Sequence, residues 1–82
     1  MDREEIFTII THHTREVIPE LEGHCFQPID SLKNLGANSV DRSEIVMMTL
    51  ESLCLNIPLI DIAAAENIGE LAGILYAKLG SK

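Results

Sequence analysis

The chain has 82 residues, of which 46% are hydrophobic and 23% are charged, with one Tyr, two Phe and no Trp. A chain of this length supports one hydrophobic core, so we expect a single domain over 1–82 without a deep catalytic cleft. Thirteen acids against six bases give a formal net charge of −7, which disfavours nucleic acid and anionic membranes as partners and favours basic protein surfaces.

The first predicted element is an amphipathic helix from Asp2 to Ile18, which Pro19 ends. This segment begins with charged residues and lacks the long apolar stretch of an export signal, so we expect a cytoplasmic protein. Apolar residues recur along it every three or four positions and form the face that we expect to be buried. They are Ile6, Ile9, Ile10, His13 and Val17.

A long ordered loop is predicted next, over residues 20–37. It contains Gly23, Pro28 and Gly36 and has no sustained hydrophobic periodicity. Scattered apolar side chains are expected to attach the loop to the core. They are Leu21, Phe26, Ile29, Leu32 and Leu35.

A second helix is predicted from about Ser39 to Leu55, and Pro58 forces a break after it. Between Asn38 and Ala77 the acids outnumber the single base Arg42, so this half of the chain is the predicted docking side. The residues expected to face inward are Ile45, Val46, Thr49, Leu50 and Leu53. Those expected to face outward are Asp41, Glu44, Glu51 and Ser52.

A short helix is predicted over the alanine-rich segment Asp61–Ala65, followed by a last helix that ends at Gly80. Asn67 and Glu70 have the spacing of a capping box at the start of that last helix. Because no strand alternation or repeat competes, we predict an all-α fold, a four-helix bundle with a long first loop and a short third helix. The expected buried face of the last helix is Ile68, Leu71, Ile74, Leu75 and Leu79.

The two cysteines, Cys25 and Cys54, are predicted to be reduced, because Cys54 lies in an apolar helical run where a buried thiol is usual. Met47 and Met48 lie in the same run. We expect one of these methionines in the core and the other on an adaptable apolar surface.

A serine stands directly before the periodicity of the second helix, in the segment LGANSVD at residues 35–41. Asn38 is a good N-cap residue, so it can satisfy an early backbone N–H and leave the Ser39 hydroxyl free. Helix N-termini favour anions, so a phosphodiester on Ser39 would be stabilised there. From this local pattern alone, however, an ordinary serine at a helix start is the better interpretation.

The wider segment LGANSVDRSEIV resembles the signature of acyl carrier proteins, in which Leu-Gly-(small)-Asp-Ser-Leu opens an acidic helix, and the Ile57-Pro58 pair also fits. The resemblance implies a non-catalytic carrier. A phosphopantetheinyl transferase would attach 4'-phosphopantetheine from coenzyme A to Ser39, and the arm would carry acyl groups as thioesters. The enzymes served would be acyltransferases, ketosynthases or hydroxymethylglutaryl (HMG) synthase-like enzymes. The residues implied on the partner side are Val40, Asp41, Arg42, Glu44, Met47 and Glu51.

Several residues depart from the family pattern. Asn38 and Val40 replace the usual Asp and Leu, Arg42 adds a positive charge, and Leu59-Ile60 with the alanines at 63–65 occupy positions where many relatives carry acids. These differences predict a specialised partner, since removing expected charges penalises a general one. The segment GANSVDRSEI is similar to free-standing monomeric carriers of polyketide clusters, including those that donate acetyl units to an HMG synthase-like enzyme in β-branching.

Two other functions stay open at this level. One is a fatty-acid, peptidyl or aryl carrier, and the other is a small helical interaction module whose Ser39 is never modified. Ser31 is a competing attachment site because Asp30-Ser31-Leu32 spells the family tripeptide, but no helical periodicity follows it.

Metal and catalytic sites are disfavoured. The pair His12 and Glu16 and the dipeptide His24-Cys25 lack further ligands at zinc-binding spacing, so no metal is predicted. Pairing Ser39 with His12 or a neighbouring histidine as nucleophile and base would lack a glycine elbow and an orienting residue.

Overall fold

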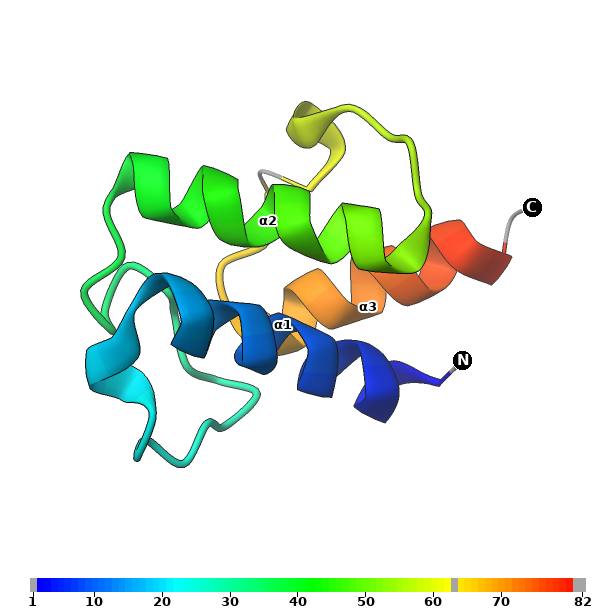
Figure 1. Cartoon of the computed structure of the whole chain (residues 1–82). Coiled ribbons are helices and arrows are strands. Elements are labelled where there is room, and N and C mark those ends of the chain that lie inside the picture. Colours follow the sequence, from blue (N-terminus) through cyan, green and yellow to red (C-terminus); the bar gives the residue numbers. More distant parts are fainter. Residues whose placement is uncertain (1, 63, 81–82) are drawn as a thin grey trace.

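Three α-helices and two 3₁₀ turns form the secondary structure of residues 2–62 and 64–80, the part of the chain that the computed structural model describes (Figure 1). The helices are α1 (Arg3–Val17), α2 (Ser39–Leu53) and α3 (Ile68–Gly80), and the turns are η1 (Pro19–Leu21) and η2 (Leu59–Asp61). No residue in these ranges lies in a strand, which confirms the all-α class. No helix in the same ranges has the length and apolar character needed to cross a bilayer.

Helix α1 begins at a reciprocal cap. The Asp2 carboxylate accepts a hydrogen bond from the Glu5 backbone N–H at 2.8 Å, and the Glu5 carboxylate accepts one from the Asp2 N–H at 3.4 Å. Ile6 and Ile10 are fully buried as predicted, and Thr14 joins them because its hydroxyl donates to the Ile10 carbonyl at 2.7 Å. The remaining members of the predicted face are half-buried, namely Ile9, His13 and Val17.

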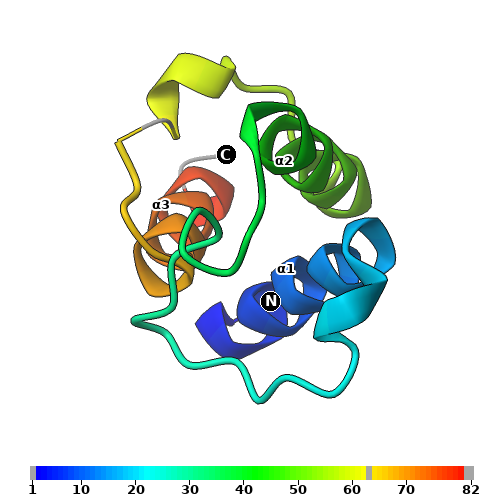
Figure 2. The same cartoon turned by 90° about the vertical axis from the view of Figure 1, so that its left-hand side faces the viewer.

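The hydrophobic core lies where α1 packs against both α2 and α3 (Figure 1, Figure 2). The predicted inward faces of α2 and α3 supply their side chains to it. The fully buried apolar residues from the three helices are Ile6, Ile10, Ile45, Ile68 and Leu75. The connecting segments add Phe26, Leu55 and Ile62 to the core, so these segments are part of the packed structure.

The predicted long loop between η1 and α2 is present, but its attachment differs from the prediction. Phe26 is buried, whereas Ile29 is 81% exposed, so the expected anchoring role of Ile29 is wrong. The other four predicted side chains do pack on the core, namely Leu21, Phe26, Leu32 and Leu35. Main-chain groups add to this attachment, because Ile68 N–H donates to the Asp30 carbonyl at 2.9 Å and Gly69 N–H donates to the Pro28 carbonyl at 2.8 Å. The first N–H groups of a helix have no partner within the helix, and here two loop carbonyls accept hydrogen bonds from them.

The predicted short third helix at Asp61–Ala65 is wrong, so the described fold has three α-helices and not four. The chain forms the single 3₁₀ turn η2 instead, followed by turn residues, and Ala63 lies outside the described residues. No side chain caps η2. Leu59 and Ile60 are exposed, and Ile62 alone is anchored in the core at 5% exposure. A segment this short has too few buried contacts to offset the cost of nucleating an α-helix.

Cys54 ends α2 in the left-handed region at φ 55° and is exposed, so the expectation of a buried thiol is wrong. The preceding residue, Leu53, is the last inward position of the helix. Once the chain turns out of the helix, the next side chain no longer follows the helical period. Both Cys54 and Cys25 are free thiols.

Candidate functional site

Ser39 is the first residue of α2, and its side chain is exposed. The cap comes from its neighbour as predicted, because the Asn38 side-chain oxygen accepts from the Asp41 N–H at 2.8 Å. The Asp41 carboxylate in turn accepts from the Asn38 N–H at 3.4 Å, completing a capping box. The Ser39 hydroxyl therefore takes no part in capping the helix.

A turn in the preceding loop places the chain at the start of α2. Gly36 has φ 104°, a conformation that side-chain-bearing residues rarely adopt. The Ala37 N–H then donates to the Leu32 carbonyl at 3.0 Å, and the Ala37 side chain is buried. The loop is thus fixed immediately before the N-cap, and the start of α2 is held in place.

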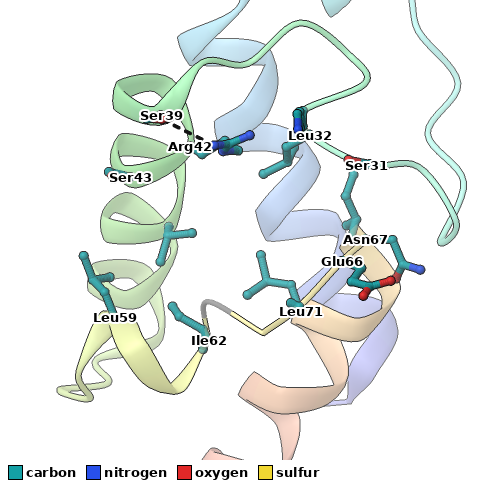
Figure 3. A pocket seen from close by; sticks show the side chains of 14 residues that line it. Ser31, Leu32, Ser39, Arg42, Ser43, Leu59, Ile62, Glu66, Asn67 and Leu71 are labelled. Atoms are coloured by element: carbon teal, nitrogen blue, oxygen red, sulfur yellow. Dashed lines mark hydrogen bonds between the residues drawn. The ribbon is translucent and has the colours of Figure 1, made fainter.

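A cavity of about 560 Å³ lies beside Ser39, between α2, α3 and the long loop (Figure 3). Ser39 and Arg42 lie on its α2 side, and Ser31 and Leu32 lie on its loop side. Most of the remaining wall is apolar, and the residues involved are Val46, Leu59, Ile62, Ala65, Ile68 and Leu71. Sequence patterns gave no sign of this cavity, because it depends on the separation of two helices that both pack on α1.

Arg42 lies one turn after Ser39, and its Nη2 is 3.4 Å from the Ser39 Oγ. The side chain is half-buried and extends from α2 toward Leu32 (Figure 3). A guanidinium therefore borders both the serine hydroxyl and the cavity. The resemblance implied Arg42 on the partner side, and it gave no sign that this side chain also borders a cavity.

The other residues predicted to face a partner lie on the outside of α2, with one exception. Val40 is 73% exposed and Met47 is 57% exposed, and Glu44 and Glu51 are exposed. Asp41 is half-buried because its carboxylate belongs to the capping box. The expectation of one core and one surface methionine fits Met47, while its neighbour in sequence is half-buried rather than fully enclosed.

The exposed apolar surface of α2 continues onto the following connection. Leu59 is 43% exposed and Ile60 is 79% exposed. Met47 and Leu59 share the wall of a shallow hollow with Leu50, Glu51, Leu55 and Ile57. We call the exposed set Val40, Met47, Leu59 and Ile60 the apolar face.

The competing sites do not assemble in the structure. Ser31 is half-buried in the loop, where its hydroxyl accepts from the Asn34 N–H at 3.4 Å. The His13 ring bridges Glu16 and Ser52, with its Nδ1 2.7 Å from the Glu16 carboxylate and its Nε2 2.7 Å from the Ser52 hydroxyl. This bridge lies near the C-terminal end of α2, away from Ser39. Within the described residues no group of three or more His, Cys, Asp or Glu side chains could hold a metal ion.

Comparison with known proteins places this geometry in context. No protein-family model matches the chain. The chain is 52% identical over 81 residues to the polyketide biosynthesis acyl-carrier-protein AcpK of Bacillus subtilis (strain 168), an alignment that covers 99% of each protein. It is also similar, with a TM-score of 0.92 and 54% identity, to a chain in the crystal structure of the curacin biosynthetic pathway HMG synthase in complex with acetyl donor-ACP. That likeness covers 95% of this chain and all of the other.

Proposed function

Because the chain belongs to the acyl carrier proteins of polyketide biosynthesis, we propose that Ser39 carries the 4'-phosphopantetheine arm of this carrier. The observation that carries the proposal is the exposed hydroxyl at the first position of α2, which the capping box leaves unused. A phosphopantetheinyl transferase acting in the cytoplasm would load it from coenzyme A. Ser31 is a poorer acceptor, since it is half-buried in the loop and does not stand at the start of an α-helix.

The residues around Ser39 fit an attached phosphodiester. The first backbone N–H groups of α2 point toward this end of the helix, and the peptide dipoles favour negative charge there. Arg42 lies within hydrogen-bonding distance of the attachment oxygen. When bound, the arm supplies a terminal thiol that holds the acyl cargo. The chain's own contribution is to fix the attachment point, to leave it open to enzymes and to border it with a largely apolar cavity.

We further propose that the cargo is an acetyl unit and that its acceptor is an HMG synthase-like enzyme. The similar chain of 54% identity is described as an acetyl donor-ACP in complex with such an enzyme. The apolar face supports a specific partner, since an exposed cluster of this kind gains free energy when a partner covers it. Glu44 and Glu51 beside it would steer a basic enzyme surface toward the monomeric carrier.

The attachment site is tested by intact-mass measurement. After incubation with coenzyme A and a broad-specificity phosphopantetheinyl transferase, the wild-type protein should gain one arm. Ser39→Ala should gain none, and the matched variant Ser31→Ala should gain one. An arm on Ser39→Ala would refute the site.

The partner is tested by transfer from the acetyl-loaded protein. We expect efficient transfer to an HMG synthase-like enzyme and poor use by a fatty-acid ketosynthase. Reversing Glu44 and Glu51 to Lys should slow association with the first enzyme, and added salt should slow the wild-type reaction in the same way. Equal use by both enzymes would leave only a general carrier function standing.

A further inference from the structure

Arg42 stands out among the three arginines for the group that it contacts. None of the three has a carboxylate partner within 4.0 Å among the described residues. Arg3 donates to the Gly69 carbonyl at 3.5 Å, and Arg15 donates to the His24 carbonyl at 3.3 Å. The contact of Arg42 is instead the Ser39 hydroxyl, at 3.4 Å. An arginine without a counter-ion is therefore directed at the oxygen proposed for modification.

The charged side chains around Ser39 allow an anion to bind beside Arg42. The capping box directs the carboxylate of Asp41 toward the Asn38 N–H, so it does not neutralise Arg42. On the far side of the cavity Glu66 adds negative charge, whereas Lys33 lines the loop side. An anion at Ser39 is thus repelled from one wall and attracted to Arg42.

The chemistry of a guanidinium suits a phosphodiester. Its planar fork offers several N–H donors, which can form two parallel hydrogen bonds to phosphate oxygens. A distance of 3.4 Å is long for a hydrogen bond to a neutral hydroxyl, and charge-assisted bonds are shorter and stronger. Arg42 stands three positions after Ser39, so the two side chains lie on neighbouring turns of one helix face.

We propose that Arg42 is a positioning residue that holds the phosphodiester on Ser39 in the free carrier and thereby fixes the direction in which the arm leaves α2. This rests on the proposed modification of Ser39. The guanidinium borders the cavity, so the held phosphate starts the arm at the cavity mouth rather than out in solvent. A partner enzyme that binds Arg42 would release the phosphate from it. Arg42 would then contact the phosphodiester in the free carrier and the enzyme in the complex.

The first experiment observes the arginines directly. The ¹⁵Nε–¹Hε spectrum of the protein contains signals from three arginines, Arg3, Arg15 and Arg42. Conversion from the apo to the holo form should shift the Arg42 signal and leave those of Arg3 and Arg15 in place. The ³¹P line of the holo protein should narrow in Arg42→Gln, because the phosphodiester then moves more freely.

The second experiment compares melting temperatures of apo and holo forms. Attachment of the arm should stabilise Arg42→Gln less than wild type, because the guanidinium that binds the phosphodiester is gone. The melting temperature of the holo form minus that of the apo form should therefore be about 2–4 °C lower in this variant. Arg42→Lys keeps the charge without the fork and should give an intermediate value. Arg15→Gln is the matched control, because its loss of contacts affects both forms equally and leaves the difference unchanged.

The outcomes separate this inference from the function on which it rests. Intact mass first establishes that each variant carries the arm on Ser39. If the wild-type protein does not gain the arm, the proposed modification of Ser39 is itself wrong. A loaded wild-type protein whose Arg42 signal does not move, and whose melting difference is the same in Arg42→Gln, would overturn the role of Arg42 alone.

Discussion

Residues 22–38 and 54–67 both connect helices and both place side chains in the core, but the first connection is also bonded to α3 through its main chain. Phe26 anchors the first connection in the core, and the carbonyls of Pro28 and Asp30 accept from the first N–H groups of α3. In the described part of the second connection, the side chains of Leu55 and Ile62 reach the core and the Asp61 carboxylate lies 3.6 Å from the Lys78 ammonium. Main-chain bonds to α3 fix the first connection as a whole, whereas the side-chain anchors Leu55 and Ile62 leave Leu59 and Ile60 between them exposed and free to face a partner.

The largest expected effect comes from removing the Ile62 side chain from the core. Ile62→Ala should lower the free energy of unfolding by about 2–4 kcal/mol, because it deletes a buried side chain and leaves a cavity. Ile60→Ala is the matched control two positions earlier, and at 79% exposure it should change stability by less than about 0.5 kcal/mol. Urea unfolding of both variants measures the difference. Equal losses would mean that the second connection is not held by Ile62.

The main-chain attachment of the first connection can be broken at Gly69. A Cβ at this position would lie 2.9 Å from the Pro28 carbonyl oxygen and 3.0 Å from the Pro28 Cβ. Gly69→Ala should therefore cost about 1–3 kcal/mol despite the better helix propensity of alanine. Gly23→Ala serves as the control, because a Cβ there meets nothing within 4 Å. If Gly69→Ala is as stable as wild type in urea unfolding, the loop does not need its close approach to α3.

The proposed role of the second connection in partner binding predicts a smaller effect, on transfer rather than on folding. Replacing both Leu59 and Ile60 by Ala removes half of the apolar face and should lower kcat/KM for acetyl transfer to the HMG synthase-like enzyme by about tenfold. Ile29→Ala is the control, since this residue at 81% is about as exposed as Ile60 at 79% but lies in the first connection. If Ile29→Ala slows transfer as much, the two connections do not differ in function.

The smallest expected effect concerns the side chains that brace the first connection. The backbone N–H of Gln27 and the His24 ring, whose Nε2 lies 3.0 Å from the Asp30 carboxylate, hold the pKa of Asp30 below its ordinary value of 3.8. A lowered folded pKa means that this carboxylate contributes stability above its unfolded pKa and that the contribution is lost as the pH falls through the folded pKa.

Asp30→Asn tests this contribution, because asparagine keeps an oxygen that can accept from Gln27 and removes only the charge. The variant should be less stable than wild type at about pH 6, and the gap should close toward about pH 3. Unfolding by urea across this range measures it. A gap that does not change with pH would assign the effect to the hydrogen bonds and not to the charge.

The helices and the start of α2 could be predicted from the sequence because local rules determine them. Periodic apolar residues identified the buried faces of α1, α2 and α3, and Asn38 identified the cap that frees Ser39. The exposed positions of Val40 and Met47 agree with the partner side that the resemblance to acyl carrier proteins implied. The resemblance to acyl carrier proteins, which the sequence of residues 35–46 suggested, agrees with the two similar proteins.

The features that could not be predicted depend on contacts between distant parts of the chain. The loop attaches through most of the side chains expected to hold it, but Ile29 is exposed and the main-chain bonds to Ile68 and Gly69 had no counterpart in the sequence pattern. The alanine-rich segment Asp61–Ala65 suggested a short helix, whereas its described residues form no α-helix and the turn η2 at Leu59–Asp61 includes only the first of them. The cavity and the inward direction of Arg42 follow from how α2 and α3 are spaced around α1, which no local pattern encodes.

The capping box of α2 bears on how this carrier could be adapted to foreign enzymes. Asp41 is both a structural group of the helix start and one of the acids beside the attachment serine. A designer who changes charge at Asp41 alters folding and recognition together, so the two effects cannot be assigned separately. Glu44 and Glu51 make no hydrogen bond or ion pair through their side chains among the described residues. Orthogonal carrier and enzyme pairs should therefore be built by rewriting those two positions while Asp41 is kept.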